Sequence, residues 1–557
     1  MLHVFFHMSV KTNLSLWQNT LSALLLQLTT NEGKSEMAET DATQNEWTIM
    51  FHFGSDNDLS LLNISQIKAV KEAGYQKNTE LLLYFDSFET GVPTRLFDIN
   101  PKGSSNRRGT RIGDGKDPFV RSFLKDQILP ETMDRSKGEC TRALCDKLKE
   151  PDSMTASEGL ENFIGYCIEN KPAKHYILFL VGHGLIVGND NFMLDAKPKS
   201  GIGLVKFGEI MKTFKAKAAA KGGEVELLCL HSCSMSAIEI SCELKNTAKY
   251  MIASQGFSYI GSWPYRQLMK KIFNVTEKGL TDASIRDLVQ RIYELSLYNA
   301  PDFAFSGYSH DLTLCSLAED KIVQLLGPLQ KLADNLRWSV KKKRGRQLIS
   351  LAHLQSQSFW REEYTDIYDF CSCLIENCSF DSEFDTSLAN DCLAVMKVFD
   401  RPGYAFDNLI VYTDNFGWQY RYARGLSIYF PWSRPLGDIE NDPIKNYSGY
   451  TFVKDLGAGQ AWFGFLQDYW NETVRKLDDI NPNETEVINM VDSLEVSFSK
   501  PGGAMNKPGG SAADSPCICP SIKNFPTAVK LGRRVQRYSA TGGVDPAFDD
   551  TEPAQFE

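Results

Sequence analysis

The stretch HYILFLVGHG, residues 175–184, joins a run of large apolar side chains to a histidine between two glycines. Residues 176–181 contain no charged side chain, which is typical of a strand that is buried on both faces of a sheet. Gly182 and Gly184 follow this run, and glycine is typical of the turn after a strand. The pattern therefore predicts a buried strand that ends just before His183.

Similar apolar runs recur between residues 46 and 300, and apolar residues at helical spacing lie between them. The predicted strands are at 47–53, 80–86, 175–181, 225–230 and 250–254. The predicted helices include segments at 59–73, 160–167, 204–214 and 237–248. Strands that alternate with helices predict an α/β fold, here an α/β/α sandwich with a mostly parallel sheet.

With 557 residues, the chain is longer than one typical domain. We expect an α/β domain at 46–300 and a mixed α+β C-terminal subdomain at 301–485. The subdomain has helical patterns near 319–337, 360–378 and 461–478 and a strand pattern at 425–430. Residues 486–557 include a segment rich in Gly, Pro and Ser, which predicts a disordered tail. Residues 1–45 are interpreted as a disordered or spurious extension, since Met37 is a second plausible start.

The composition excludes some function classes. A formal net charge of −10 argues against a general nucleic-acid binder. The 13 cysteines are scattered and odd in number, which favours reduced thiols over a secreted disulfide framework. The N-terminus lacks a basic segment before its short, broken apolar stretches, so neither a signal peptide nor a membrane span is predicted. We therefore expect a cytoplasmic protein without a membrane partner.

A cysteine follows the fourth predicted strand, in VELLCLHSCSMS at 225–236. Cys233 is 50 residues after His183, a distance that fits one crossover helix. The carboxyl ends of neighbouring parallel strands meet at one edge of a sheet, so the two side chains are expected to lie side by side. A thiolate nucleophile needs such a base or proton donor. Backbone N–H groups of Gly184 and Cys233 are candidates for an oxyanion hole, and a helix predicted from residue 234 would favour the thiolate.

Two other interpretations of Cys233 remain open on these residues. A cysteine at a strand end is commonly a small core residue. Cys229, His231 and Cys233 alternate, so in a strand they would share a face and could bind zinc together with His183. Cys229 lies inside an apolar run and should be buried, which counts against zinc, and no metal is expected.

Several segments together resemble one family. They are WTIMFHFGSDNDLS at 47–60, GHG at 182–184, SCSMSAIE at 232–239, ASQGFSYIGSWPY at 253–265 and GLSIYFP at 425–431. In order and spacing they resemble the clostripain-like cysteine peptidases, in the clan of caspases, gingipains and legumains, over about 46–480. The resemblance implies a caspase-like fold, an endopeptidase with catalytic Cys233 and His183, and a protein or peptide substrate. It implies no cofactor, although calcium dependence occurs in the family.

The chain departs from the family where the substrate side chain is recognised. The family usually has Asp two residues before the cysteine, where this chain has His231, and an acidic residue where it has Gln255. With Ser254, these residues are the expected specificity pocket. Asp86, Asp190 or Asp195 could supply a replacement carboxylate. Preference for Arg or Lys, preference for another side chain, and loss of activity all remain open.

The resemblance also implies internal cleavage between the histidine and the cysteine. Lys199, followed by Ser200 in DAKPKSGIG at 195–203, is the candidate site, and an uncut surface loop is the alternative. A further basic candidate is GRRV at 532–535. The rival to a peptidase is a non-catalytic caspase-like binding or regulatory module. In either case a regulatory partner is conceivable through the C-terminal region.

Overall fold

The computed structural model describes most of the chain between residues 44 and 477. The described residues are 44–71, 73, 76–86, 88, 95–98, 155–188, 190–196, 198–299, 309–359, 363–379, 385–400, 405–435 and 442–477. The predicted tail at 486–557, the GRRV segment and the predicted N-terminal extension up to residue 43 lie outside them. The described residues from Asn45 onward belong to one compact unit.

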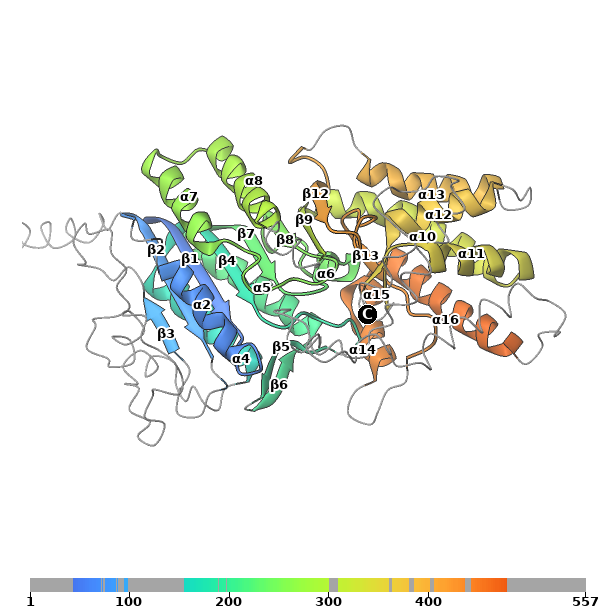
Figure 1. Ribbon diagram of the computed structural model, residues 1–557, viewed down its shortest axis with the longest axis horizontal. Coiled ribbons are helices and arrows are strands. Elements are labelled where there is room, and N and C mark those ends of the chain that lie inside the picture. Colours follow the sequence, from blue (N-terminus) through green and yellow to red (C-terminus); the bar gives the residue numbers. More distant parts are fainter. Residues whose placement is uncertain are drawn as a thin grey trace, which may run out of the picture. The chain divides into compact units, whose positions relative to one another are not determined.

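An eight-stranded sheet forms the centre of the fold (Figure 1), in the order β12-β9-β8-β7-β4-β1-β2-β3. Its strands are β1 (Asn45–Phe53), β2 (Thr79–Phe85), β3 (Arg95–Asp98), β4 (Ala173–Val181), β7 (Glu224–His231), β8 (Tyr250–Ala253), β9 (His310–Ser316) and β12 (Ile410–Phe416). The five central strands, β8, β7, β4, β1 and β2, are parallel, and antiparallel strands complete both edges. The predicted mostly parallel sheet is confirmed.

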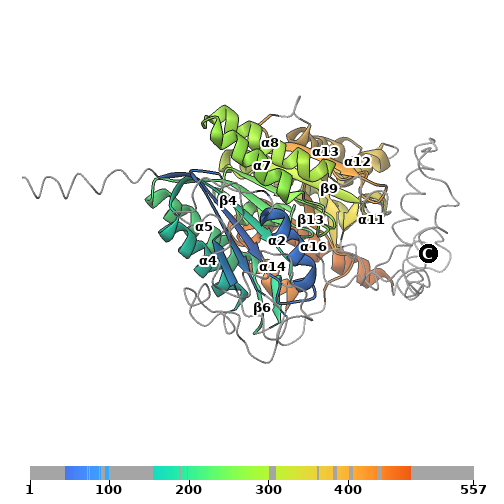
Figure 2. The ribbon, with the colours of Figure 1, turned by 60° about the vertical axis from the view of Figure 1, so that its left-hand side comes forward.

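Helices cover both faces of this sheet (Figure 2). One face packs on α4 (Ala156–Asn170) and α5 (Leu204–Ala220), and the other on α2 (Ser60–Lys71), α7 (Tyr265–Glu277) and α8 (Asp282–Tyr298). Side chains along β4 alternate between the two layers. Leu178 and Leu180 belong to the first core, and Phe179 and Val181 to the second. Because both faces are covered, β4 needs the unbroken apolar run seen in the sequence.

The residues after 300 add a helical layer and a small antiparallel sheet. The helices are α10 (Glu319–Val340), α11 (Lys343–Gln355), α12 (Ile367–Cys378), α13 (Asp385–Phe399), α14 (Pro443–Gly449), α15 (Thr451–Asp455) and α16 (Gly457–Leu477). The sheet consists of β10 (Ser358–Phe359), β11 (Tyr364–Asp366) and β13 (Ser427–Tyr429). β9 and β12 also follow residue 300 but pair into the large sheet, so that sheet crosses the predicted division.

Two further observations concern the described residues alone. No described helix is both long enough and apolar enough to cross a membrane.

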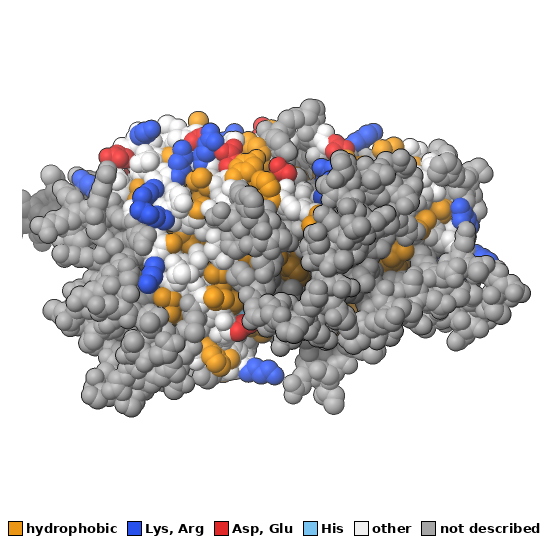
Figure 3. All heavy atoms as spheres, in the orientation of Figure 1, with side chains coloured by type: hydrophobic (Ala, Val, Ile, Leu, Met, Phe, Trp, Pro, Cys, Tyr) orange, Lys and Arg blue, Asp and Glu red, His pale blue; other side chains and the backbone are white. Residues whose placement is uncertain are grey.

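On the face seen in Figure 3, basic and acidic side chains lie close together over α7 and α8. The surface there mixes both signs of charge.

Candidate active site

β4 and β7 bring the two predicted catalytic segments together. They pair in parallel, and the last pair in register is Val181 with His231. His183 and Cys233 therefore each follow that pair by two residues. A Cβ atom on Gly184 would lie 1.8 Å from the carbonyl oxygen and 2.8 Å from the nitrogen of Cys233. Only glycine fits at position 184, because the two backbones are already in contact there.

Cys233 is held by the loop that follows β8. Its side chain is buried, with 2% of the residue exposed, and the backbone N–H of Ser258 donates to Sγ over 3.2 Å. Ser234, the next residue, has a φ of 57°, a left-handed conformation that turns the chain sharply after the cysteine. The other eight cysteines among the described residues are free thiols.

The helix after the cysteine begins later than predicted. α6 (Ile238–Glu243) starts at Ile238, not at residue 234. The chain first turns at Ser234, and the residues that follow pair with other segments before the helix begins. Ser234 and Ser236 donate N–H groups to Gly256 and Ser254, each over 2.9 Å. Ser236 also accepts from the N–H of Ser427 in β13 over 3.0 Å. The proposed stabilisation of the thiolate by a helix N-terminus is therefore wrong, since that end is several residues away.

His183 is paired with a carboxylate that the sequence did not single out. Its Nε2 donates to Oδ1 of Asp58 over 2.7 Å. The residue His183 is 3% exposed, and the Asp58 side chain is 76% exposed. The hydrogen bond from His183 lowers the pKa of Asp58, against a smaller opposing effect of burial. Asp58 belongs to the polar turn after β1. Asp58 could have been found from the position of its turn. β1 neighbours β4 in a parallel sheet, so the residues after both strands lie at the same end of the sheet.

His231, expected in the specificity pocket, is fully buried. Its Nε2 is 2.8 Å from the carbonyl oxygen of Tyr259, and its Nδ1 is hydrogen-bonded to the hydroxyl of Tyr265. The ring stacks on Trp263, with 5.1 Å between centroids. Burial lowers the pKa of His231 to about 3, so the imidazole is neutral at physiological pH.

Gln255 joins the end of β8 to the later segments. Its Nε2 donates to Oδ2 of Asp366 over 2.9 Å, and its Oε1 accepts from the N–H of Gly425 over 2.9 Å. Its backbone N–H donates to Asp311 over 2.7 Å. Burial raises the pKa of both Asp311 and Asp366 to about 7. The hydroxyl of neighbouring Ser254 donates to the carbonyl of Ser232 over 3.3 Å.

The three candidate replacement carboxylates, Asp86, Asp190 and Asp195, lie on different segments of the fold. Asp86 follows β2, which β1 separates from β4. Asp190 accepts from the N–H of Leu204 over 3.4 Å and is hydrogen-bonded to the hydroxyl of Tyr450. Burial raises the pKa of Asp190. Asp195 is buried in β5 (Phe192–Ala196) of a two-stranded hairpin.

Lys199, the candidate processing site, begins the other strand of that hairpin, β6 (Lys199–Ile202), and is exposed. The hydroxyl of the next residue, Ser200, accepts from the N–H of Ala156 over 3.0 Å. Lys199 is thus exposed, while the residue after the candidate peptide bond, Ser200, is hydrogen-bonded to the start of α4.

The donors of the zinc alternative are not grouped. Cys229 is fully buried in β7, and burial raises its thiol pKa well above the usual value. Within the described part of the chain, no three His, Cys, Asp or Glu side chains are arranged to hold a metal ion.

The model of the Peptidase_C11 or clostripain family matches residues 51–469, more than half of the chain. The chain belongs to the clostripain family. The resemblance drawn from the sequence is thereby confirmed, and the protein is a clostripain-like cysteine peptidase. Hydrolysis through a cysteine nucleophile needs no cofactor.

Other comparisons are more distant. No curated protein matches the sequence. A solved structure of an inactive zymogen C11 protease from Parabacteroides distasonis has 17% identity and a TM-score of 0.42, covering 76% of this chain and 99% of its own. A secreted C11 cysteine protease from Bacteroides thetaiotaomicron, in complex with an irreversible peptide inhibitor, has 12% identity and a TM-score of 0.44. That match covers 75% of this chain and 99% of the other.

Glu239 connects the segment after Cys233 to the C-terminal region. Its Oε1 accepts from the N–H of Tyr429 over 3.0 Å and from the hydroxyl of Tyr447 over 2.9 Å. Its Oε2 is buried without a hydrogen-bond partner among the described residues. Burial raises the pKa of Glu239 from 4.5 to about 7, so the carboxyl group stays neutral to a higher pH in the folded protein than in the unfolded chain.

We predict that Glu239→Gln stabilises the protein at alkaline pH. The folded pKa is above the unfolded one, so ionisation of Glu239 costs stability progressively as pH rises from about 4.5 through about 7. Glutamine keeps the acceptor and removes the charge. The free energy of unfolding in urea should therefore rise by about 1–3 kcal/mol at pH 8 and change little at pH 4.5. The exposed Glu277→Gln serves as the control, and an equal gain at both pH values would contradict the prediction.

Proposed function

We propose that the protein is a cysteine endopeptidase in which Cys233 is the nucleophile and His183 the proton donor. The observation that carries this proposal is the backbone contact between Gly184 and Cys233 at the carboxyl ends of adjacent parallel strands. It places the imidazole-bearing and thiol-bearing segments at one point of the sheet edge. Ligand sites of open α/β sheets collect at this edge.

The reaction follows from these groups. His183 takes the thiol proton of Cys233, Sγ attacks the peptide carbonyl carbon, and the oxyanion accepts from the N–H groups of Gly184 and Cys233. The C–N bond breaks as His183 transfers a proton to the departing amine, which leaves a thioester on Cys233. Water then attacks the thioester while His183 takes up its proton, and the thiol is regenerated. Since Asp58 engages Nε2, Nδ1 is the nitrogen that transfers the proton.

The nucleophile must be a reduced thiol before the enzyme can act. A sulfur in a disulfide has no thiolate to attack a carbonyl. Activity is therefore expected in the presence of a thiol reductant, and all assays below include one.

The first test compares Cys233→Ala and His183→Ala with the reduced wild type. Each substitution should lower peptide hydrolysis by at least about 10³-fold. An electrophilic peptide should label Cys233 in the wild type, as detected by mass spectrometry of the digest. Cys167→Ala, which removes a buried free thiol on α4, is the control and should retain activity. Cleavage that survives Cys233→Ala would refute the mechanism. A reduced wild type that neither cleaves peptides nor takes the label would instead favour a non-catalytic binding module.

Asp58 is proposed to act through His183 as a positioning residue. Its carboxylate holds one ring nitrogen and so determines which nitrogen faces the reaction. Because Asp58 is largely exposed, its loss should disturb orientation more than folding.

Asp58→Asn should lower kcat about tenfold and leave KM nearly unchanged, because the imidazole loses its charged acceptor. Asp58→Glu, which keeps the carboxylate, should recover part of the activity. Steady-state kinetics on a fluorogenic peptide would measure both variants. An equal change of KM, or no recovery with glutamate, would contradict the positioning role.

We propose that His231, Ser254 and Gln255, all fully buried, lie behind the specificity pocket and leave it without a carboxylate. His231 is uncharged and both its ring nitrogens are hydrogen-bonded. The Gln255 amide is likewise engaged by Asp366 and Gly425. Neither family position offers a carboxylate to a guanidinium, and a buried cation without a partner is costly. The residue before the scissile bond is therefore selected for shape and hydrogen bonding and not for positive charge.

A peptide-library cleavage profile should then show uncharged residues before most cuts. A strong predominance of Arg or Lys would overturn the neutral pocket and direct attention to Asp86, Asp190 or Asp195. Intact-mass measurement of the same samples reports on self-processing. Cleavage after the exposed Lys199 in the wild type, absent in Cys233→Ala, would support that site and would show that lysine is accepted.

A further inference from the structure

A cavity lies at the amino ends of the central strands, at the opposite end of these strands from Cys233. Its volume is about 710 Å³, and His175, Glu224 and Tyr250 of β4, β7 and β8 line it. Residues of α5 and α8 complete its walls. The size is within the range of small-molecule sites. The family's chemistry takes place at the other ends of these strands, so this cavity has no part in the proposed hydrolysis.

The cavity walls are basic although the chain is acidic. Five cationic side chains line the cavity, Lys174, Lys215, Lys249, Arg286 and Lys321. The lining carboxylates are Glu224 and Asp407. The walls thus carry an excess of positive charge in a chain with a net charge of −10. Such a local excess raises the concentration of anions near it.

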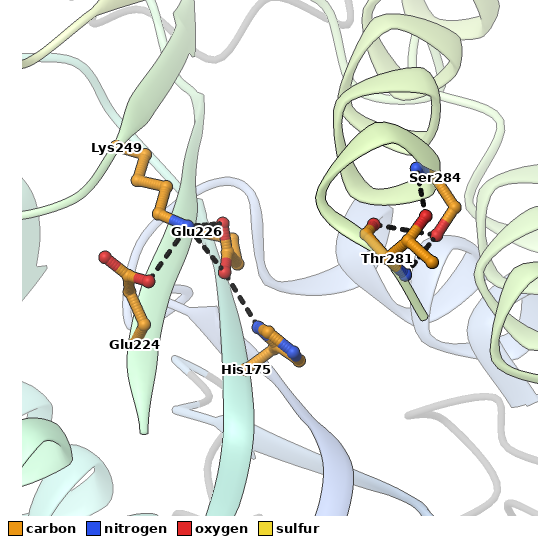
Figure 4. A network of polar contacts seen from close by, with 6 residues as sticks. All are labelled: His175, Glu224, Glu226, Lys249, Thr281 and Ser284. Atoms are coloured by element: carbon orange, nitrogen blue, oxygen red, sulfur yellow. Dashed lines mark hydrogen bonds and ion pairs between the residues drawn. The ribbon is translucent and has the colours of Figure 1, made fainter. Parts of the chain in front are cut away.

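Some of these cations are already paired. Figure 4 shows Lys249 between two carboxylates, 2.8 Å from Glu224 and 3.1 Å from Glu226. Glu226 is also 2.7 Å from Nδ1 of His175. Outside the cavity lining, Glu46 pairs with Lys174 and Asp320 with Lys321. This network holds Lys249 and His175 in place. The other donors of the cavity walls remain available to a ligand.

Three donors in the walls have no such partner. Lys215 and Arg286 form no ion pair with any described carboxylate, although Arg286 lies over the ring of Phe406, 5.8 Å from its centroid. Tyr250 is only 7% exposed, and its hydroxyl has no hydrogen-bond partner among the described residues. Burial raises the pKa of Tyr250, and the charges of Arg286 and Lys249 oppose that rise. The hydroxyl is therefore a protonated donor beside these cations.

The first turn of α8 holds Arg286 in place. Figure 4 shows the capping box that begins this helix, in which the N–H of Ser284 donates to the hydroxyl of Thr281 over 3.2 Å. The N–H of Thr281 in turn donates to the hydroxyl of Ser284 over 2.8 Å. This reciprocal cap fixes the start of the helix at Asp282, four residues before Arg286.

We propose that this cavity binds a small molecule that carries two or more phosphate groups. Lys215 is on α5 and Arg286 is on α8, and these helices cover opposite faces of the sheet. Two linked phosphate groups match cations that come from two separate layers of the fold. Tyr250, at the edge of the sheet between them, supplies a neutral donor. Ammonium and guanidinium groups are the side chains that proteins use most for phosphate.

The test is calorimetric titration of the full chain carrying Cys233→Ala, which prevents self-cleavage, with inorganic tripolyphosphate. We expect one site per chain, and at least tenfold weaker binding of orthophosphate. The double variant Lys215→Ala/Arg286→Ala should weaken tripolyphosphate binding at least tenfold, and Tyr250→Phe by a few fold. A parallel titration with ATP shows whether a nucleoside adds affinity or whether the phosphates alone are recognised.

The control is the double variant Lys217→Ala/Arg291→Ala. It removes the same charge from the same two helices at positions outside the cavity lining. It should bind tripolyphosphate as the parent does, and thermal unfolding of each variant without ligand verifies that it is folded. Absence of binding to the parent would overturn the proposal. So would equal weakening in both double variants, or orthophosphate that binds as tightly as tripolyphosphate.

Discussion

The close approach of the β4 and β7 ends is the constraint on which the rest of the site depends. Gly184 and Cys233 touch through their backbones, with no room for a side chain at position 184. This contact follows from a parallel register that continues to the last residue of each strand. The segments that carry His183 and Cys233 are thereby confined to one short stretch at the carboxyl ends of the strands. Preorganisation of this kind supplies much of the catalytic effect of enzymes, because no reorganisation is needed as charge develops.

The loop with Cys233 is held mainly by segments far away in the sequence. Ser234 and Ser236 are bonded to the loop after β8, and Ser236 is also bonded to β13. The side chain of Gln255, in the loop after β8, is in turn hydrogen-bonded to Asp366 and Gly425. The region after residue 300 therefore contributes directly to the geometry of the loop with Cys233, as a support that limits how far this loop can move.

This support consists largely of buried polar groups. Glu239, Asp311 and Asp366 are carboxyl groups in the interior, and burial raises the pKa of each to about 7. An ionised carboxylate without a cation is costly in such surroundings, and the backbone N–H bonds that these groups accept offset part of this cost. Hydrogen bonds of this kind have fixed directions, which hydrophobic contacts lack. Their directionality orients the loops around Cys233.

The sequence alone determined the strands, the helices between them and the placement of His183 and Cys233 after two strands, because these depend on local patterns of apolar residues. It missed Asp58 as the partner of His183, and it placed the helix after Cys233 four residues too early. The tertiary structure decided both, since Asp58 meets His183 across 125 residues of sequence and the pairing of Ser236 with Ser427 spans 191. It also decided the surroundings of His231 and Gln255, whose charge and accessibility depend on residues that no local pattern brings together. Local periodicity reports on which face of an element is buried, whereas hydrogen-bond partners from distant segments become known only when the chain has folded.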